Sequence, residues 1–186
     1  MIKLENEIVK LRAPELSDVD LLYAWENNME IWRVSNTISP FSKHALIKYI
    51  ENYKLDIFQT KQLRLMVEAK DQSSLMNYPV GIIDLFDYDP FHQRAGVGIL
   101  IHNTEHRGRG YATEALKLLT AYAFEYLHLH QLYCNIASNN EPSLKLFTNQ
   151  DFEIVGLKKD WIRTKNGWLG EYTLQRINPL ALISKC

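Results

Sequence analysis

The chain has 186 residues, of which 46% are hydrophobic and 23% charged. This is the composition of one ordinary globular domain, not of a disordered or fibrous protein. A formal net charge of −1 gives no global field that would recruit nucleic acid or an anionic membrane, and two cysteines exclude a disulfide framework and a cysteine-based zinc site. No segment approaches 18 unbroken apolar residues, so we expect no membrane span and a single cytoplasmic domain over residues 1–186.

Periodicity predicts alternating strands and helices along the whole chain. The expected elements are, in order, strand 8–12, a helix that Ser17 caps and that ends near Asn28, a helix from Ser42 through Leu55, strands 63–69, 80–86 and 94–101, a long helix after the loop 103–108, strand 132–137, a helix near 142–148, and a hairpin around Asn166-Gly167. Asn-Gly is the strongest signal for a type I′ turn. The order predicts an α/β (α+β) fold with one mixed sheet and helices on its faces.

The most informative segment runs from Ile99 to Thr113. A buried strand leads into Arg107-Gly108-Arg109-Gly110, which opens the long amphipathic helix. Glycine lets the backbone turn tightly and approach a ligand, and the unpaired N–H groups and dipole at a helix start favour an anion. Because two arginines add positive charge there, the segment suits a phosphate or pyrophosphate.

The loop matches neither common nucleotide fingerprint. It lacks the Lys-Ser/Thr ending of a P-loop, and it lacks G-x-G-x-x-G with an acidic residue about 20 positions on. A solvated turn whose glycines merely end the strand and begin the helix is the alternative interpretation.

At these residues the chain resembles the GNAT superfamily of acyl-CoA-dependent N-acetyltransferases. The family signature Gln/Arg-x-x-Gly-x-Gly/Ala appears as Arg107 through Ala112, and a second family element, an Asn followed by a short helix, appears as Asn140 through Phe147. The resemblance covers essentially the whole chain. It is nearest to the branch that holds spermidine acetyltransferases and ribosomal-protein N-acetyltransferases, through Gly81–Leu85, Arg94-Ala95 and Asn166-Gly167.

The resemblance implies a fold and a co-substrate. The fold would be a single-domain GNAT fold with a mixed six- to seven-stranded sheet, in which a splayed strand pair forms the slot for acetyl-CoA. Pantetheine would lie along Ile99, Leu100 and Ile101, with Asn140 and Phe147 on its other side. The pyrophosphate would bind the amides of Arg107, Gly108, Arg109, Gly110, Tyr111, Ala112 and Thr113.

Acetylation of an alkyl amine needs a base, because an ammonium with a pKa near 10 must lose a proton before it attacks a thioester. Asp84 is the candidate base, since the family places an acidic residue at this strand position. Asp87 and Glu30 are the candidate substrate-binding residues, and Asp89 adds to an acidic rim. The alternatives are that Asp87 and Asp89 belong to a solvated turn, and that Glu26 and Glu30 are i,i+4 acids on the solvent side of one helix.

The group that protonates the leaving thiolate stays unassigned. Many family members use a tyrosine where this chain has Phe147. Tyr133, Tyr172, Cys134 or water could serve instead.

The favoured function is acetylation of a small amine, most of all a polyamine such as spermidine, by direct attack in a ternary complex. Protein N-terminal acetylation and a non-catalytic acyl-CoA-binding module are the rivals. We expect no metal, no nucleic acid and no membrane partner, and a homo-oligomer is possible. The stretch 34–40 lacks the acidic cluster of the spermidine enzymes.

Overall fold

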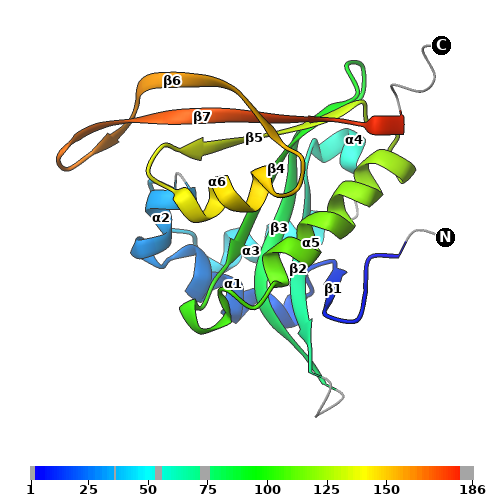
Figure 1. Ribbon diagram of the computed structural model, residues 1–186. Helices are drawn as coiled ribbons and strands as arrows, with labels where there is room; N and C mark the ends of the chain where they lie inside the picture. The colour runs from blue at the N-terminus through cyan, green and yellow to red at the C-terminus, as the bar shows by residue number, and fades with distance from the viewer. Residues whose placement is uncertain (1–2, 36, 53–55, 72–75, 181–186) are drawn as a thin grey trace.

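The computed structural model describes residues 3–35, 37–52, 56–71 and 76–180. Within these ranges seven strands form one sheet in the order β1-β2-β3-β4-β5-β7-β6 (Figure 1). Neighbouring strands are antiparallel except for β4 and β5, which are parallel, so the predicted mixed sheet is confirmed. The strands are β1 (Val9–Arg12), β2 (Leu63–Lys70), β3 (Asn77–Asp89), β4 (Arg94–Ile101), β5 (Gln131–Ala137), β6 (Glu153–Thr164) and β7 (Gly167–Ile177).

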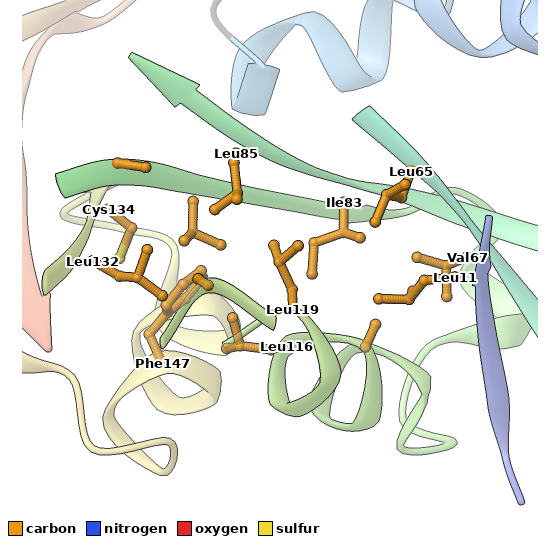
Figure 2. Packing of buried hydrophobic residues seen from close by; sticks show 14 of the residues in the cluster. Leu11, Leu65, Val67, Ile83, Leu85, Leu116, Leu119, Leu132, Cys134 and Phe147 are labelled. Atoms are coloured by element: carbon orange, nitrogen blue, oxygen red, sulfur yellow. The ribbon is translucent and has the colours of Figure 1, made fainter. Parts of the chain in front are cut away.

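Helices cover both faces of this sheet, as expected. They are α1 (Val19–Glu26), α2 (Met29–Ser35), α3 (Lys43–Glu51), α4 (Ile57–Thr60), α5 (Tyr111–Ala121, followed by a π-helical turn at Tyr122–Tyr126) and α6 (Glu141–Thr148). Figure 2 shows Leu116 and Leu119 of α5 in one apolar cluster with Ile83 of β3, and Leu119 lies beside Ile83. On the other face α1 and α3 bury Leu22, Trp25, Leu46 and Ile50 against Met66 and Ile82.

Local sequence signals set several element ends. Ser42 caps α3, where its hydroxyl accepts a hydrogen bond from the Ala45 N–H at 3.1 Å. Ser17 does not cap a helix, contrary to prediction. It lies inside a short 3₁₀ turn, and Glu15 is the residue before that turn, where it forms a capping box with Asp18.

The first predicted helix ends at Glu26, close to its predicted end near Asn28, and the helix α2 that follows from Met29 was not predicted. The last hairpin forms, but Gly167 (φ 128°) and not Asn166 carries the positive φ, so its turn is not type I′. Helix α4 has no counterpart in the prediction, and Leu55 and Cys186 lie outside the described residues.

The sheet opens between β4 and β5. The two strands pair only at Arg94–Gly96 against Gln131–Tyr133. Beyond these pairs β4 stays with β3 as far as Ile101, and β5 stays with β7 as far as Ala137, so the two halves of the sheet diverge. This is the splayed strand pair that the resemblance implied.

Candidate functional site

A cleft of about 550 Å³ occupies the opening between β4 and β5. Its walls come from both sides of the gap, and its lining includes Val97–Leu100 on β4 and Cys134–Ala137 on β5. Helix α6 contributes to one end, and α1, β2 and β3 contribute to the other. The cleft therefore runs through the sheet from the α6 side to the α1 side.

Helix α6 supplies Asn140, Ser143 and Phe147 to this lining. The Asn140 side chain accepts a hydrogen bond from the Ser143 N–H at 3.2 Å, which caps the helix and fixes its position. Phe147 is buried and packs edge-on against Phe152, with 5.0 Å between ring centroids. Both predicted residues of this element thus reach the cleft.

The glycine loop has the conformation that the sequence indicated. Gly108 (φ 74°) and Gly110 (φ 84°) both lie in the left-handed region, where side chains are disfavoured. Helix α5 begins directly after Gly110 without a side-chain cap, so the N–H groups of its first turn are available to an anion. Free amides at the start of an 11-residue helix fit a pyrophosphate.

The Arg107 side chain turns back toward the end of β4 instead of pointing away from it. Its Nε donates to the Ile101 carbonyl at 3.2 Å, and Nη2 donates to the His102 carbonyl at 3.4 Å. Arg107 therefore holds the loop to the strand. Ile99 and Leu100 line the cleft, whereas Ile101 is buried in the core.

On the α1 side, one guanidinium joins two carboxylates in the cleft wall. Arg64 donates to both oxygens of Asp84, from Nε at 2.7 Å and from Nη2 at 3.1 Å, and its Nη1 donates to Glu26 at 2.5 Å. Burial alone would lower the pKa of Arg64, but the charges of Asp84 and Glu26 outweigh it and raise that pKa. Asp84 is thus a paired carboxylate that lines the cleft.

Strand register keeps the space in front of Asp84 open. Arg64, Asp84 and Gly98 are direct partners across β2, β3 and β4, so they lie on the same face of the sheet. Gly98 has no side chain to separate Asp84 from the gap. A β-carbon at Gly96 would lie 2.2 Å from the Phe86 ring, which shows how closely this ring covers the strand.

Glu26 does not lie on a solvent-facing stripe with Glu30, contrary to one alternative above. The break between α1 and α2 turns Glu26 inward, where its side chain is only 11% exposed. The Trp32 Nε1 donates to the Glu26 carbonyl at 2.6 Å and fixes this end of α1.

The two predicted substrate-binding acids lie outside the cleft. Glu30 is exposed at the start of α2. Asp87 is exposed with φ 49°, and it accepts a hydrogen bond from the Tyr133 hydroxyl at 3.2 Å at a separate hollow that Asp89 and Arg94 also line.

The candidate proton donors differ in position. Cys134 lines the cleft, and burial raises its pKa to about 12. Burial likewise raises the pKa of Tyr133 to about 12, and its hydroxyl already binds Asp87 at the other hollow. Tyr172 packs against the core cluster.

The sequence predicted neither a metal site nor a membrane span. In the part of the chain that the structure describes, no group of three or more His, Cys, Asp or Glu side chains is arranged to hold a metal ion. No helix among the described residues is long and apolar enough to cross a membrane.

Sequence reasoning left Glu26 open, beside Glu30, and did not assign Gly98, Arg64 or Glu171 to this site. Gly98 belongs to Gly96-Val97-Gly98, and glycines inside a strand indicate a close approach. Arg64 on β2 and Glu171 on β7 join the site through strand register, which no local motif announces.

Comparisons with known proteins agree with this geometry. The family model of the acetyltransferase (GNAT) domain matches residues 9–153. The chain is 27% identical over 176 residues to the uncharacterized N-acetyltransferase p20 of Bacillus licheniformis, covering 92% of this chain and 94% of that one. It is 25% identical over 150 residues to a spermidine N(1)-acetyltransferase of Vibrio cholerae, covering 79% and 80%.

The fold is also similar to that of a solved structure. The crystal structure of spermidine N-acetyltransferase from Vibrio cholerae in complex with CoA and spermine superposes with a TM-score of 0.81 at 22% identity, covering 95% of this chain and 99% of that one. The open β4–β5 pair, the uncapped start of α5 and the family match over most of the chain lead to one conclusion. The chain belongs to the GNAT acetyltransferase family.

Proposed function

We propose that this acetyl-CoA-dependent N-acetyltransferase acetylates a primary amine of a small polycation, a polyamine such as spermidine. The observation that carries the proposal is the charge of the cleft. Among the described residues that line it are three carboxylates, Glu26, Asp84 and Glu171, and one guanidinium, Arg64. Arg64 pairs with Glu26 and Asp84 and Lys158 pairs with Glu171, which leaves one carboxylate in excess of these cations. Excess negative charge in a cleft raises the local concentration of cationic substrates. Similarity to a spermidine acetyltransferase supports the same class.

Acetyl-CoA supplies the activated acyl thioester. The nitrogen lone pair of the acceptor forms a C–N bond to the acyl carbon, the C–S bond breaks, CoA leaves as the thiol, and the proton lost by the amine goes to a base or to water. At pH 7 the ammonium of an alkyl amine must first lose a proton, and the gap of about three pK units is worth about 4 kcal/mol.

Asp84 is the proposed base, acting directly or through water. It lines the cleft beside the open space at Gly98, and its salt bridge uses one lone pair on each oxygen, so each oxygen retains another acceptor site. Arg64 donates to both oxygens and fixes the plane of the carboxylate. Asp84 would therefore receive a proton in a defined direction.

The remaining proposed contacts follow the length of the cleft. The amides of Arg107 through Thr113 would bind the pyrophosphate, Ile99 through Ile101 the pantetheine, and Asn140 with Phe147 its other side. Asp87 follows Phe86 and Glu30 precedes Ile31, and both Phe86 and Ile31 line the cleft. They remain proposed outer contacts for the far end of a long polycation.

The leaving thiolate needs no protein donor in this proposal. A thiol like that of CoA has a pKa of about 8.5. A proton from Cys134 or Tyr133, whose pKa values are about 12, would move uphill. The thiolate would therefore leave as such and take up a proton by equilibration with bulk solvent, where a thiol of this pKa is mostly protonated at pH 7, so Phe147 does not prevent the reaction.

Location and assembly are further parts of the proposal. A cytoplasmic enzyme is consistent with the free thiol of Cys134. A homo-oligomer is supported by the similar fold of the dodecameric spermidine N-acetyltransferase from Vibrio cholerae, which has a TM-score of 0.74 at 21% identity and covers 97% of this chain and all of that one.

The pH profile of kcat/KM distinguishes the acceptor classes. With spermidine we expect kcat/KM to rise by more than about tenfold from pH 7 to pH 9, but by less than the roughly 100-fold increase in free base, because Asp84 takes the proton at the lower pH. With an N-terminal peptide, whose α-amine has a pKa near 8, a flatter profile is expected. Higher kcat/KM for the peptide at every pH would contradict the polyamine proposal and favour protein N-terminal acetylation.

A further inference from the structure

We propose that Glu171 binds the ammonium of the acceptor, and that Lys158 competes with the acceptor for this carboxylate. The inference rests on the proposed function and names the residue that selects a cationic substrate. Glu171 lines the cleft with only 6% of its side chain exposed, and it forms an ion pair with the Lys158 Nζ.

Strand register places Glu171 across the gap from Asp84. Glu171 pairs with Ala137 at the end of β5, whereas Asp84 pairs with Gly98 on β4, so the two carboxylates belong to opposite walls of the cleft. Gly96 and Tyr133 are partners across β4 and β5. Gly98 follows Gly96 by two residues and Ala137 follows Tyr133 by four, and even spacings along a strand keep side chains on one face, so Asp84 and Glu171 lie on the same face of the sheet. An amine in the gap would therefore approach the thioester between two carboxylates.

The carboxylates on the two walls of the cleft bind different kinds of cation. Asp84 and Glu26 are held by Arg64, whose planar guanidinium stays charged and makes a fixed fork of hydrogen bonds. Glu171 is held by a lysine, which is a primary alkylammonium on a flexible stem. This is the same chemical group as the proposed acceptor, so an acceptor ammonium can replace Lys158 and leave the ion pair intact.

Lys158 also has other partners near the cleft. Its Nζ lies 3.4 Å from Asn135 Oδ1 and 4.6 Å from the centroid of the Trp161 ring. A third of the Lys158 side chain is exposed. The ammonium can therefore leave Glu171 while it keeps a cation–π contact or enters solvent, so the exchange does not strand a buried charge.

The backbone of β6 is irregular beside this pair. The register between β6 and β7 shifts between Lys158 and Ile162, and Asp160 has φ 47°. A β-carbon at Gly170 would lie 3.1 Å from the Lys158 carbonyl oxygen, so the two strands approach closely next to Glu171. Bulges of this kind re-aim side chains and are common beside active sites.

Steady-state kinetics with Glu171→Gln and Lys158→Met test the inference. We expect Glu171→Gln to raise the KM for spermidine by about 10- to 100-fold with an unchanged KM for acetyl-CoA, because a charge-assisted contact is lost. We expect Lys158→Met to lower the KM for spermidine by about 2- to 5-fold, because the competitor is gone. Asp20→Asn, which breaks the exposed Lys43–Asp20 pair, is the matched control and should change neither KM.

The opposite signs separate this role from a merely structural one. If the pair only stabilised the hairpin of β6 and β7, both variants would raise the KM, and that result would overturn the inference, as would an unchanged KM in Glu171→Gln. If the wild type acetylates no amine, the proposed function fails. Whether a cation displaces Lys158 from Glu171 is then decided by the next experiment, which needs no turnover.

Chemical labelling of the wild type needs no folded variant and no turnover. Acetic anhydride labels free lysine amines, and mass spectrometry reports the extent at Lys158 and at Lys43. Tetramethylputrescine, a dication whose tertiary amines cannot be acetylated, is the probe. We expect it to increase labelling of Lys158 several-fold and to leave Lys43 unchanged. Equal labelling of Lys158 with and without the probe would contradict displacement.

Discussion

Asp84 on β3 and Arg64 on β2 form a two-pronged salt bridge inside the cleft, with contacts of 2.7 and 3.1 Å. The guanidinium fixes the plane of the Asp84 carboxylate and therefore the direction from which a proton can reach it.

Arg64→Met should destabilise the protein strongly. Two largely enclosed carboxylates, Asp84 and Glu26, would lose their shared cation, and removing one partner of a fully buried pair costs about 3–5 kcal/mol, so we expect a loss of about 2–4 kcal/mol here. Denaturant unfolding of the variant and the wild type at pH 7 checks this, and an unchanged free energy of unfolding would contradict it.

Asp84→Asn should reduce kcat by about 100-fold at pH 7 and by much less at pH 9, where more acceptor is already the free base. Glu26→Gln, which also loses a hydrogen-bonded carboxylate on Arg64, is the matched control. Its effect should not depend on pH in this way. Equal losses for Asp84→Asn at both pH values would assign Asp84 to positioning alone.

Gly110→Val should weaken CoA binding by more than about tenfold. The reason is backbone strain and not lack of space, because no atom lies within 4 Å of the added β-carbon but φ is +84°. Calorimetric titration with CoA measures the change. Gly156→Ala, at a glycine with equally open space and no positive φ, is the control. Unchanged affinity in Gly110→Val would contradict the placement of the pyrophosphate.

Cys134→Ala should retain kcat within about threefold, because a thiol with a pKa of about 12 is not a nucleophile at pH 7–9. In the wild type the unfolded chain loses this proton near pH 9 and the folded chain near pH 12. Between those two pH values the free energy of unfolding of the wild type should therefore fall by about 1.4 kcal/mol per pH unit more than that of Cys134→Ala. A burst of CoA release without acceptor, absent from Cys134→Ala, would instead show a covalent route.

Much of this fold could be predicted from the chain alone. Strand 94–101 has the predicted bounds, and Ser42 caps the helix that it was predicted to begin. These features depend on local periodicity and on caps, so a single sequence contains them. The opening between β4 and β5 follows from the family resemblance and not from any local pattern.

The charged partners in the site could not be predicted. Arg64 and Asp84 are 20 positions apart and meet only because β2 and β3 pair in one register, which includes a bulge between Val67 and Glu68. The end of α1 was predicted near Asn28, but the sequence did not indicate that Glu26 at this end turns inward to Arg64, 38 positions away. Long-range pairing decides these contacts, and the local sequence does not specify it.

The proposed reaction is tested most directly by free-thiol release from acetyl-CoA with spermidine, spermine, aminoglycosides and N-terminal peptides offered separately. We expect acceptor-dependent release with the polyamines, in equal amount to the N-acetylated product, and little release with the peptides. Tight binding of acetyl-CoA with no release for any acceptor would contradict the proposed reaction and favour a non-catalytic acyl-CoA-binding role.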